Sequence, residues 1–126
     1  MHKNLFEYAI IRVVPMVERE EFINVGVILF CKDLHYLGSK IELNSSKLLA
    51  LAPTIDIQDI QANLSALQQI CDGKASTNPI SQLSTPERFR WLTATRSTLI
   101  QCSKVHPGFC AEPSQELEKL FEKMIL

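Results

Sequence analysis

Residues 8–31 read YAIIRVVPMVEREEFINVGVILFC, which is two runs of β-branched and aliphatic residues around a short polar connection. Such runs are typical of strands, and a connection this short favours an antiparallel hairpin. Both runs are nearly continuous instead of alternating, which predicts strands that are covered on both faces or lie in the middle of a sheet. Gly26, inside the second run, predicts a bulge or a close approach by another element.

A third strand is predicted over residues 37–43, and the pattern then changes to that of helices. On this strand Lys40 and Glu42 should face outward, away from the core. The clearest helix starts at Asp56, repeats apolar residues at three- and four-residue steps, and ends at Gly73, where a C-terminal cap belongs. Shorter elements are expected at residues 45–51 (helix), 85–92 (helix or turn), 98–102 (strand) and from residue 114 onward (helix).

These elements predict an α+β fold, an antiparallel sheet of three to five strands with helices packed mainly on one face. A length of 126 residues fits a single domain over residues 1–126. The apolar stripe of the long helix and the apolar strands each need a cover, so they should pack on each other. The expected contacts join Ile60, Leu64 and Leu67 of the helix to Ile10, Val27 and Leu29 of the strands.

The composition indicates an ordinary globular protein, with 46% hydrophobic residues, 21% charged residues and a formal net charge of -1. That charge gives no whole-molecule attraction to nucleic acid or to an anionic membrane. No apolar run approaches the length of a membrane span, and the N-terminus carries no export signal. The four cysteines form no C-x-x-C pair, which indicates free thiols. We therefore expect a cytoplasmic protein that contacts no membrane.

Cys102, His106 and Cys110 recur every four residues, a spacing that would align three zinc ligands along one face of a helix. Pro107 and Gly108 lie between them, however, and predict a turn in which such a helix cannot form. A fourth ligand would also have to come from elsewhere in the chain. Free thiols are the preferred interpretation, and the sequence predicts no metal site and no cofactor.

Catalytic motifs are weak throughout the chain. Residues 116–119 read ELEK and match an acid-x-Lys nuclease motif, but on a helix they are explained by solvated charges. The histidines, His2, His35 and His106, lie in a terminus, a loop and the predicted turn, and no G-x-S-x-G elbow or phosphate-binding glycine loop is present. The sequence names no catalytic residue, although a catalytic triad can assemble from distant positions.

The most informative polar segment covers residues 84–111, where four basic residues accompany the single acid Glu87. Arg88 and Arg90 alternate with Phe89 and Trp91. Guanidinium groups and nearby hydroxyls suit phosphate or carboxylate, and an aromatic ring can stack on a base. The alternative is that the arginines pair with acids elsewhere while the aromatic rings fill the core. A site of this size would suit a nucleotide, an acidic peptide or a partner surface better than a length of duplex.

If this segment is a binding site, its cationic groups should converge on one exposed concavity. At least two of Arg88, Arg90 and Arg96 should then lie near Ser97 or Thr98. Guanidiniums that crowd together without carboxylate partners repel one another, so such a cluster would indicate a bound anion that relieves the repulsion.

Glu21 and Asn24 are a second polar pair, at the start of the second predicted strand. Asn24 lies inside an otherwise apolar run, so its amide needs partners there. Either both residues satisfy main-chain or arginine groups at the end of the hairpin, or they belong to a ligand site.

Three parts of the chain carry a family resemblance: YAIIRVVP with EFINVGVIL (residues 8–15 and 21–29), RFRWLTATRST with CSKVHPG (88–98 and 102–108), and ELEKLF (116–121). They resemble an uncharacterised bacterial family, domain of unknown function 3037, over nearly the whole chain. The resemblance implies no activity, but genes of this family tend to lie beside those of HipA-like kinases, which implies an accessory or partner role. Its motifs contain the polar residues that are the candidates for an anion- or partner-binding site: Glu21, Asn24, Arg88, Arg90, Arg96, Ser97 and His106.

The leading interpretation is a non-enzymatic binding or accessory module whose arginine-rich surface binds an anion or a partner. A phosphate-bearing ligand and a HipA-like kinase are the candidates. The alternative is an enzyme that acts on a phosphate-bearing small molecule or nucleic acid, with the same arginines as an electrostatic clamp. A structural subunit with no activity of its own is a third interpretation.

Overall fold

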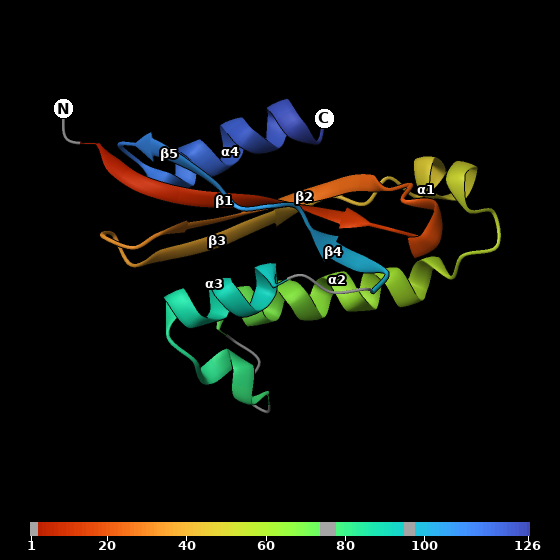
Figure 1. Ribbon diagram of the computed structural model, residues 1–126, viewed down its shortest axis with the longest axis horizontal. Coiled ribbons are helices and arrows are strands. Elements are labelled where there is room, and N and C mark those ends of the chain that lie inside the picture. Colours follow the sequence, from red (N-terminus) through yellow and green to blue (C-terminus); the bar gives the residue numbers. More distant parts are fainter. Residues whose placement is uncertain (1–2, 74–77, 95–97) are drawn as a thin grey trace.

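The computed structural model describes residues 3–73, 78–94 and 98–126 of the chain (Figure 1). Its sheet is antiparallel, with the strand order β3-β2-β1-β4, and β5 also pairs with β1. The strands are β1 (Asn4–Val13), β2 (Ile23–Cys31), β3 (Tyr36–Ile41), β4 (Ile100–Cys102) and β5 (His106–Cys110). Because β2 occupies one side of β1, β4 and β5 follow each other along its other side.

Helices cover both faces of the sheet. Figure 1 shows α2 (Ile57–Asp72) and α3 (Thr85–Thr93) along one face and α4 (Pro113–Met124) along the other. The short helix α1 (Ser45–Leu51) places Leu48 in the core on the α2 side, and 3-10 turns occupy Val17–Arg19 and Pro79–Gln82. The predicted α+β fold, with an antiparallel sheet and most helices on one face, is confirmed. Over the described residues, no helix is both long and apolar enough to cross a membrane.

The first two strands form the predicted hairpin, with Ile11 opposite Gly26. The register shifts by one residue between Ile11 and Arg12, which is the bulge that Gly26 indicated. A Cβ atom on Gly26 would also lie only 2.7 Å from the main-chain oxygen of Lys40, so β3 approaches β2 closely at this point. Both interpretations of the glycine are therefore confirmed.

The long helix α2 also begins and ends where the sequence predicts. The Asp56 side chain accepts a hydrogen bond from the main-chain N–H of Asp59 at 3.2 Å, which caps the helix N-terminus. Gly73 follows the last turn with φ of 72°, and its N–H bonds back to helix carbonyls. The position of this helix along the chain is set by these local signals.

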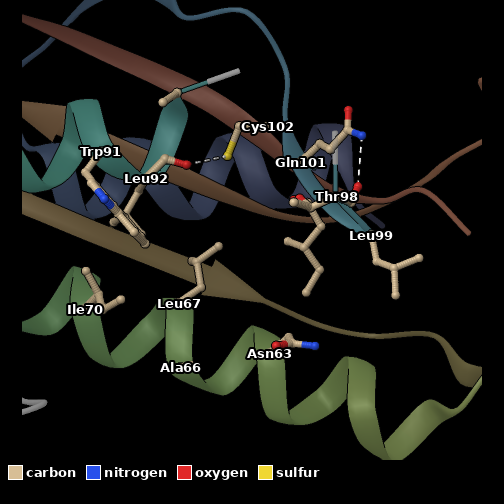
Figure 2. A pocket seen from close by; sticks show the side chains of 12 residues that line it. Asn63, Ala66, Leu67, Ile70, Trp91, Leu92, Thr98, Leu99, Gln101 and Cys102 are labelled. Carbon is tan, nitrogen blue, oxygen red and sulfur yellow. Dashed lines mark hydrogen bonds between the residues drawn. The ribbon is translucent and has the colours of Figure 1, made fainter. Parts of the chain in front are cut away.

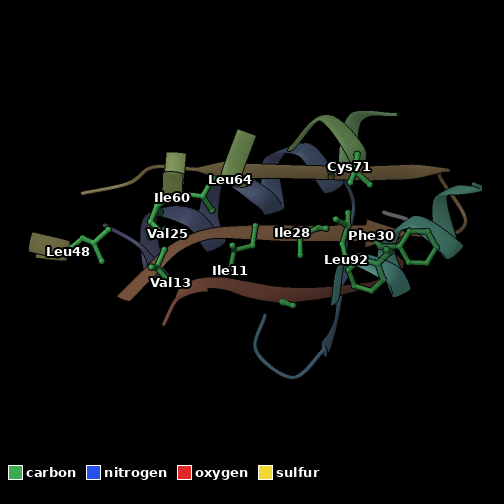
Figure 3. Close-up of a cluster of buried hydrophobic side chains, with 13 residues drawn as sticks. Ile11, Val13, Val25, Ile28, Phe30, Leu48, Ile60, Leu64, Cys71 and Leu92 are labelled. Carbon is green, nitrogen blue, oxygen red and sulfur yellow. The ribbon is translucent and has the colours of Figure 1, made fainter. Parts of the chain in front are cut away.

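The sheet separates two apolar cores. The first lies between the sheet and α2 and α3 (Figure 3), and its buried members include Ile11, Val13, Val25, Ile28, Phe30, Leu48, Ile60, Leu64, Cys71 and Leu92. The second lies under α4 and includes Phe6, Ile10, Val27, Leu29, Cys31, Leu117 and Leu120. Burial on both faces explains why the two hairpin strands are continuously apolar.

The predicted contacts of α2 were wrong by one residue along the strands. Ile60 and Leu64 are buried with Ile11 and Ile28, whereas the expected partners Ile10, Val27 and Leu29 face α4. Leu67 is only partly buried. A strand that is apolar at every position carries no alternation, so its sequence does not tell which residues meet which layer of helices.

The outward face predicted for β3 also needs correction. The Lys40 ammonium pairs with the Glu118 carboxylate of α4 and lies 4.9 Å from the centroid of the Phe121 ring. This face of β3 therefore meets α4, while Ile41 and Leu43 on the other face pack against the first core. Lys40 is compatible with this position because its alkyl stem packs while its charged end reaches the edge of α4.

Strand β5 was not predicted, and the interpretation of Pro107 and Gly108 as a turn is wrong. These residues pair with Glu7 and Phe6 of β1. A Cβ atom on Gly108 would lie 2.5 Å from the Phe6 ring, so glycine is what allows this ring to cover the strand. Proline is tolerated here because β5 is an edge strand, on which half of the main-chain nitrogens need no partner.

The four cysteines are free thiols, as expected, and three of them are buried. Cys71 lies at the end of α2 in the first core. Burial raises the pKa of the Cys71 thiol from 9.0 to about 11, and the nearby Ser39 side chain offsets only part of that increase. The thiol is therefore protonated at neutral pH and is a poor nucleophile.

We expect the melting temperature to fall as the pH rises from 9 toward 11, the range between the ordinary and the raised pKa of Cys71. Over this range the unfolded chain has lost the Cys71 proton while the native state keeps it, so stability is full below the range and is lost through it. Circular dichroism melts at a series of pH values would measure this fall. Cys71→Ala should make it shallower, and an unchanged slope in this variant would contradict the assignment.

Candidate functional site

Arg88 is part of the fold and does not point to a ligand site. Its Nη1 donates to the Leu83 carbonyl at 2.8 Å, and its Nη2 donates to the Cys71 carbonyl at 3.4 Å. The guanidinium also covers Gly73, where a Cβ atom would lie 3.5 Å from Cζ. Arg88 therefore ties α3 to the C-terminal end of α2, where free carbonyls attract a cation.

Arg90 is exposed and lies elsewhere on α3. It borders a hollow of about 350 Å³ together with Lys32, Asp33 and Glu7, over a floor that includes Leu5 and Phe30. Within the described residues, Arg90 makes no ion pair. The expected shared concavity of Arg88 and Arg90 is therefore not seen, and Arg96 and Ser97 lie outside the described residues.

Glu21 and Asn24 occupy the start of β2. Glu21 pairs with Arg19 at 2.5 Å, and the Arg19 side chain is exposed while that of Glu21 is half-buried. Asn24 lies directly across from Arg12, which was not predicted to belong to a site. Among the described residues, the buried Asn24 Oδ1 and Arg12 Nε atoms have no hydrogen-bond partner, while the Arg12 guanidinium stacks over the Phe22 ring at 4.0 Å. Arg12 is a lone cation in an apolar strand, and this signal could have marked it in the sequence as a candidate site residue.

His106 lies in β5 and contacts Tyr8, its cross-strand neighbour, with the two ring centroids 5.4 Å apart. Cys110 is buried under α4, whereas Cys102 donates from its Sγ to the Leu92 carbonyl of α3 at 3.4 Å. The three residues of the zinc-like spacing therefore do not share one face of an element. Among the described residues, no three potential ligands are grouped around a metal position.

The two aromatic residues of the arginine-rich segment have different roles. Phe89 is buried and stacks on Phe30, with centroids 5.2 Å apart, so it fills the core as the alternative interpretation proposed. Trp91 is only half-buried and lines a pocket between helix and sheet.

That pocket has a volume of about 360 Å³ (Figure 2). One wall is α2, another is the end of α3, and the third is the segment that runs into β4. Its apolar lining residues are Ala66, Leu67, Ile70, Trp91, Leu92, Ala94, Leu99, Ile100 and Cys102, and its polar ones are Asn63, Thr98 and Gln101. Among the residues that the structure describes, no charged side chain lines the pocket.

The pocket exists because α2 leaves a gap on the flank that faces β4. Ala66 is small and exposed, so it does not fill the space beside Leu67 and Ile70. Strand β4 is tied to β1 at both ends, by the Val14 N–H to the Leu99 carbonyl at 2.7 Å and by the Ser103 N–H to the Ile10 carbonyl at 2.8 Å. The third wall is therefore held at a fixed distance from the helix.

The polar groups at the pocket rim are mostly satisfied within the protein. Thr98 Oγ1 donates to the Ile100 carbonyl at 2.5 Å, and Gln101 Nε2 donates to the Thr98 carbonyl at 2.9 Å. What the pocket offers a ligand is therefore mainly apolar surface, with the Asn63 amide at its edge. Such a lining can hold an uncharged apolar group and orient it with few polar contacts.

Comparison with known protein families decides the classification. A family model described as "Protein of unknown function (DUF3037)" matches residues 8–125. The chain belongs to the DUF3037 family. The resemblance noted in the sequence is thereby confirmed, and the DUF3037 match covers the pocket and every predicted site residue. Neither the curated proteins nor the solved structures contain a match to this chain.

Proposed function

We propose that this DUF3037 protein is a binding or accessory module that holds an apolar group of its ligand in the pocket between α2, α3 and β4. The observation that carries the proposal is the pocket itself, whose 360 Å³ falls in the size range of ligand sites, about 300–1,000 Å³. The described part of its lining carries no charged side chain, which favours an uncharged inserted group. A large apolar side chain of a partner protein has the required size and chemistry.

The arginine-rich surface enters this proposal through Arg90. Arg88 is engaged with main-chain carbonyls, whereas the Arg90 guanidinium is exposed beside the hollow with Lys32. An exposed guanidinium can pair with an acidic group of a partner and speed the encounter, an effect that salt screens. Because the family's gene neighbourhood implies a HipA-like kinase, this kinase is the first partner to test.

Filling the pocket should weaken binding there without unfolding the protein. We expect Ala66→Leu to reduce the affinity for a small uncharged apolar probe, such as cyclohexylmethanol, by about tenfold or more, because the new side chain occupies the hollow. Ala62→Leu, at another exposed alanine of α2 outside the pocket, is the matched control and should bind like the wild type. Trp91 is the chain's single tryptophan, so its fluorescence reports on the occupied pocket.

A partner can be found and assigned to this pocket by photo-crosslinking in the native cell. A photoreactive residue at Leu99, on the pocket wall, should capture a partner that the same residue at Gln115 of α4 does not. Binding of the purified partner should be weakened by Ala66→Leu and preserved by Ala62→Leu. Equal probe and partner binding by these two variants would contradict the proposed function.

A further inference from the structure

Strand β5 presents an apolar surface that nothing in the described chain covers. The Phe109 side chain is 67% exposed, and its direct neighbour on β1, Leu5, is 50% exposed. Cross-strand neighbours lie on the same face of a sheet, so the two side chains form one patch at the edge of the sheet. Exposed apolar groups that adjoin one another commonly mark a contact surface.

The main-chain hydrogen-bonding pattern shows which groups of β5 face outward. The Ser103 N–H bonds to the Ile10 carbonyl, and the Val14 N–H bonds to the Leu99 carbonyl. Even-numbered residues of β1 therefore direct their main-chain groups toward β4 and β5, because this direction alternates along a strand.

Applied to the register of β5, this alternation places its even-numbered residues, His106, Gly108 and Cys110, in the ladder with β1. The N–H and C=O groups of Phe109 and the C=O group of Pro107 then point away from the sheet. Pro107 loses no ladder bond, since its nitrogen lies on the outer side, where no donor is needed. A donor and acceptors that no described residue pairs, at strand spacing, match another extended strand.

We propose that β5 pairs with β5 of a second copy of this chain, in antiparallel orientation about a two-fold axis at Phe109. Phe109 offers both a donor and an acceptor on the outer edge, so the two copies of this residue can exchange two hydrogen bonds. The same register places Pro107 of each copy opposite Ala111 of the other, where the Pro107 carbonyl can accept from the Ala111 N–H. The contact is the same on both copies and closes on itself as a dimer.

The chemistry of the edge favours a second copy as the occupant. Residues 105–111 read VHPGFCA and contain no Lys, Arg, Asp or Glu. Charged side chains are the usual means of keeping like edges apart, and none is present here to repel an identical strand. The pairing would bring the two Phe109 rings together on one face, with Leu5 of each copy beside them.

The proposed dimer leaves the binding pocket open. The pocket is lined by α2, α3 and the β4 segment, and none of its residues belongs to β5. The dimer would therefore present two pockets, and its existence does not depend on what they bind.

Sedimentation velocity over a concentration series tests the proposal. The wild type should dimerise reversibly, and Phe109→Lys should raise the dimer dissociation constant about tenfold or more, because it places a charge where the two copies meet. Leu34→Lys is the matched control: Leu34 is 45% exposed in the turn before β3, and its substitution should leave the dimer intact. Thermal melts of both variants verify that they are folded.

Amide hydrogen exchange shows whether the contact is a strand pairing. In the dimer the Phe109 amide should be protected, and it should exchange quickly on dilution or in the Phe109→Lys variant. The Gly108 amide should be protected in every case, because it bonds to β1 within one copy. A wild type that is monomeric at all concentrations, a dimer unaffected by Phe109→Lys, or an unprotected Phe109 amide in the dimer would each overturn the proposal.

Discussion

Substitution of Leu64 by alanine is expected to lower the free energy of unfolding by about 2–5 kcal/mol. Leu64 is only 4% exposed and belongs to the cluster that joins α2 to the sheet (Figure 3). Removing most of its side chain leaves a cavity between two rigid layers that cannot collapse fully. Urea denaturation followed by circular dichroism would measure the loss.

The matched control for this change is Leu49→Ala in α1. Leu49 is 40% exposed, so its truncation should alter stability by less than about 0.5 kcal/mol. A loss for Leu64→Ala as small as that of the control would mean that α2 is not a core element.

Substitution of Arg88 by glutamine is expected to lower the free energy of unfolding by about 1–3 kcal/mol. The change removes the donors that serve the Leu83 and Cys71 carbonyls and uncovers Gly73 at the end of α2. Both carbonyls would lose a charge-assisted bond in a partly buried position. The same denaturation experiment measures this effect.

Arg90→Gln is the control, because Arg90 is exposed on the same helix and makes no ion pair within the described residues. It should change stability by less than about 0.5 kcal/mol but weaken the binding of an acidic partner. If both arginine variants lost the same stability, or if Arg88→Gln lost none, the structural assignment of Arg88 would be wrong.

The two arginines show why chemistry alone does not identify a site. Arg88 and Arg90 are two residues apart in a segment rich in cations, and their sequence context is nearly the same. On a helix two residues apart means different faces, so one side chain meets the end of α2 while the other meets solvent. The assignment depends on α2, which lies outside that segment and whose position no local pattern reveals.

The apolar pocket could not be predicted for a related reason. A pocket forms where the side chains of three elements leave the space between them unfilled. In the sequence, Ala66 looks like an ordinary helix residue. The available signal for the pocket was Trp91, a large ring in a polar segment. The two predicted roles of this ring were to fill the core or to stack on a base. Its place beside β4 became visible only when α2, α3 and the sheet were brought together.

Features that depend on neighbours along the chain could be predicted from the residues alone. The Asp56 cap, the Gly73 terminator and the bulge at Gly26 were all readable, because caps, left-handed turns and bulges are chosen by a few adjacent residues. The family assignment was readable too, since the matching motifs extend over residues 8–125.

Long-range packing, in contrast, sets which face of each strand meets which helix and where a short strand joins the sheet. Leu29 belongs under α4 and Ile28 under α2, yet both sit in one unbroken apolar run. Pro107 became a strand residue because β1 had a free side for β5 to occupy. In each case the deciding free energy comes from residues far apart in the chain, and packing of this kind overrides local preference.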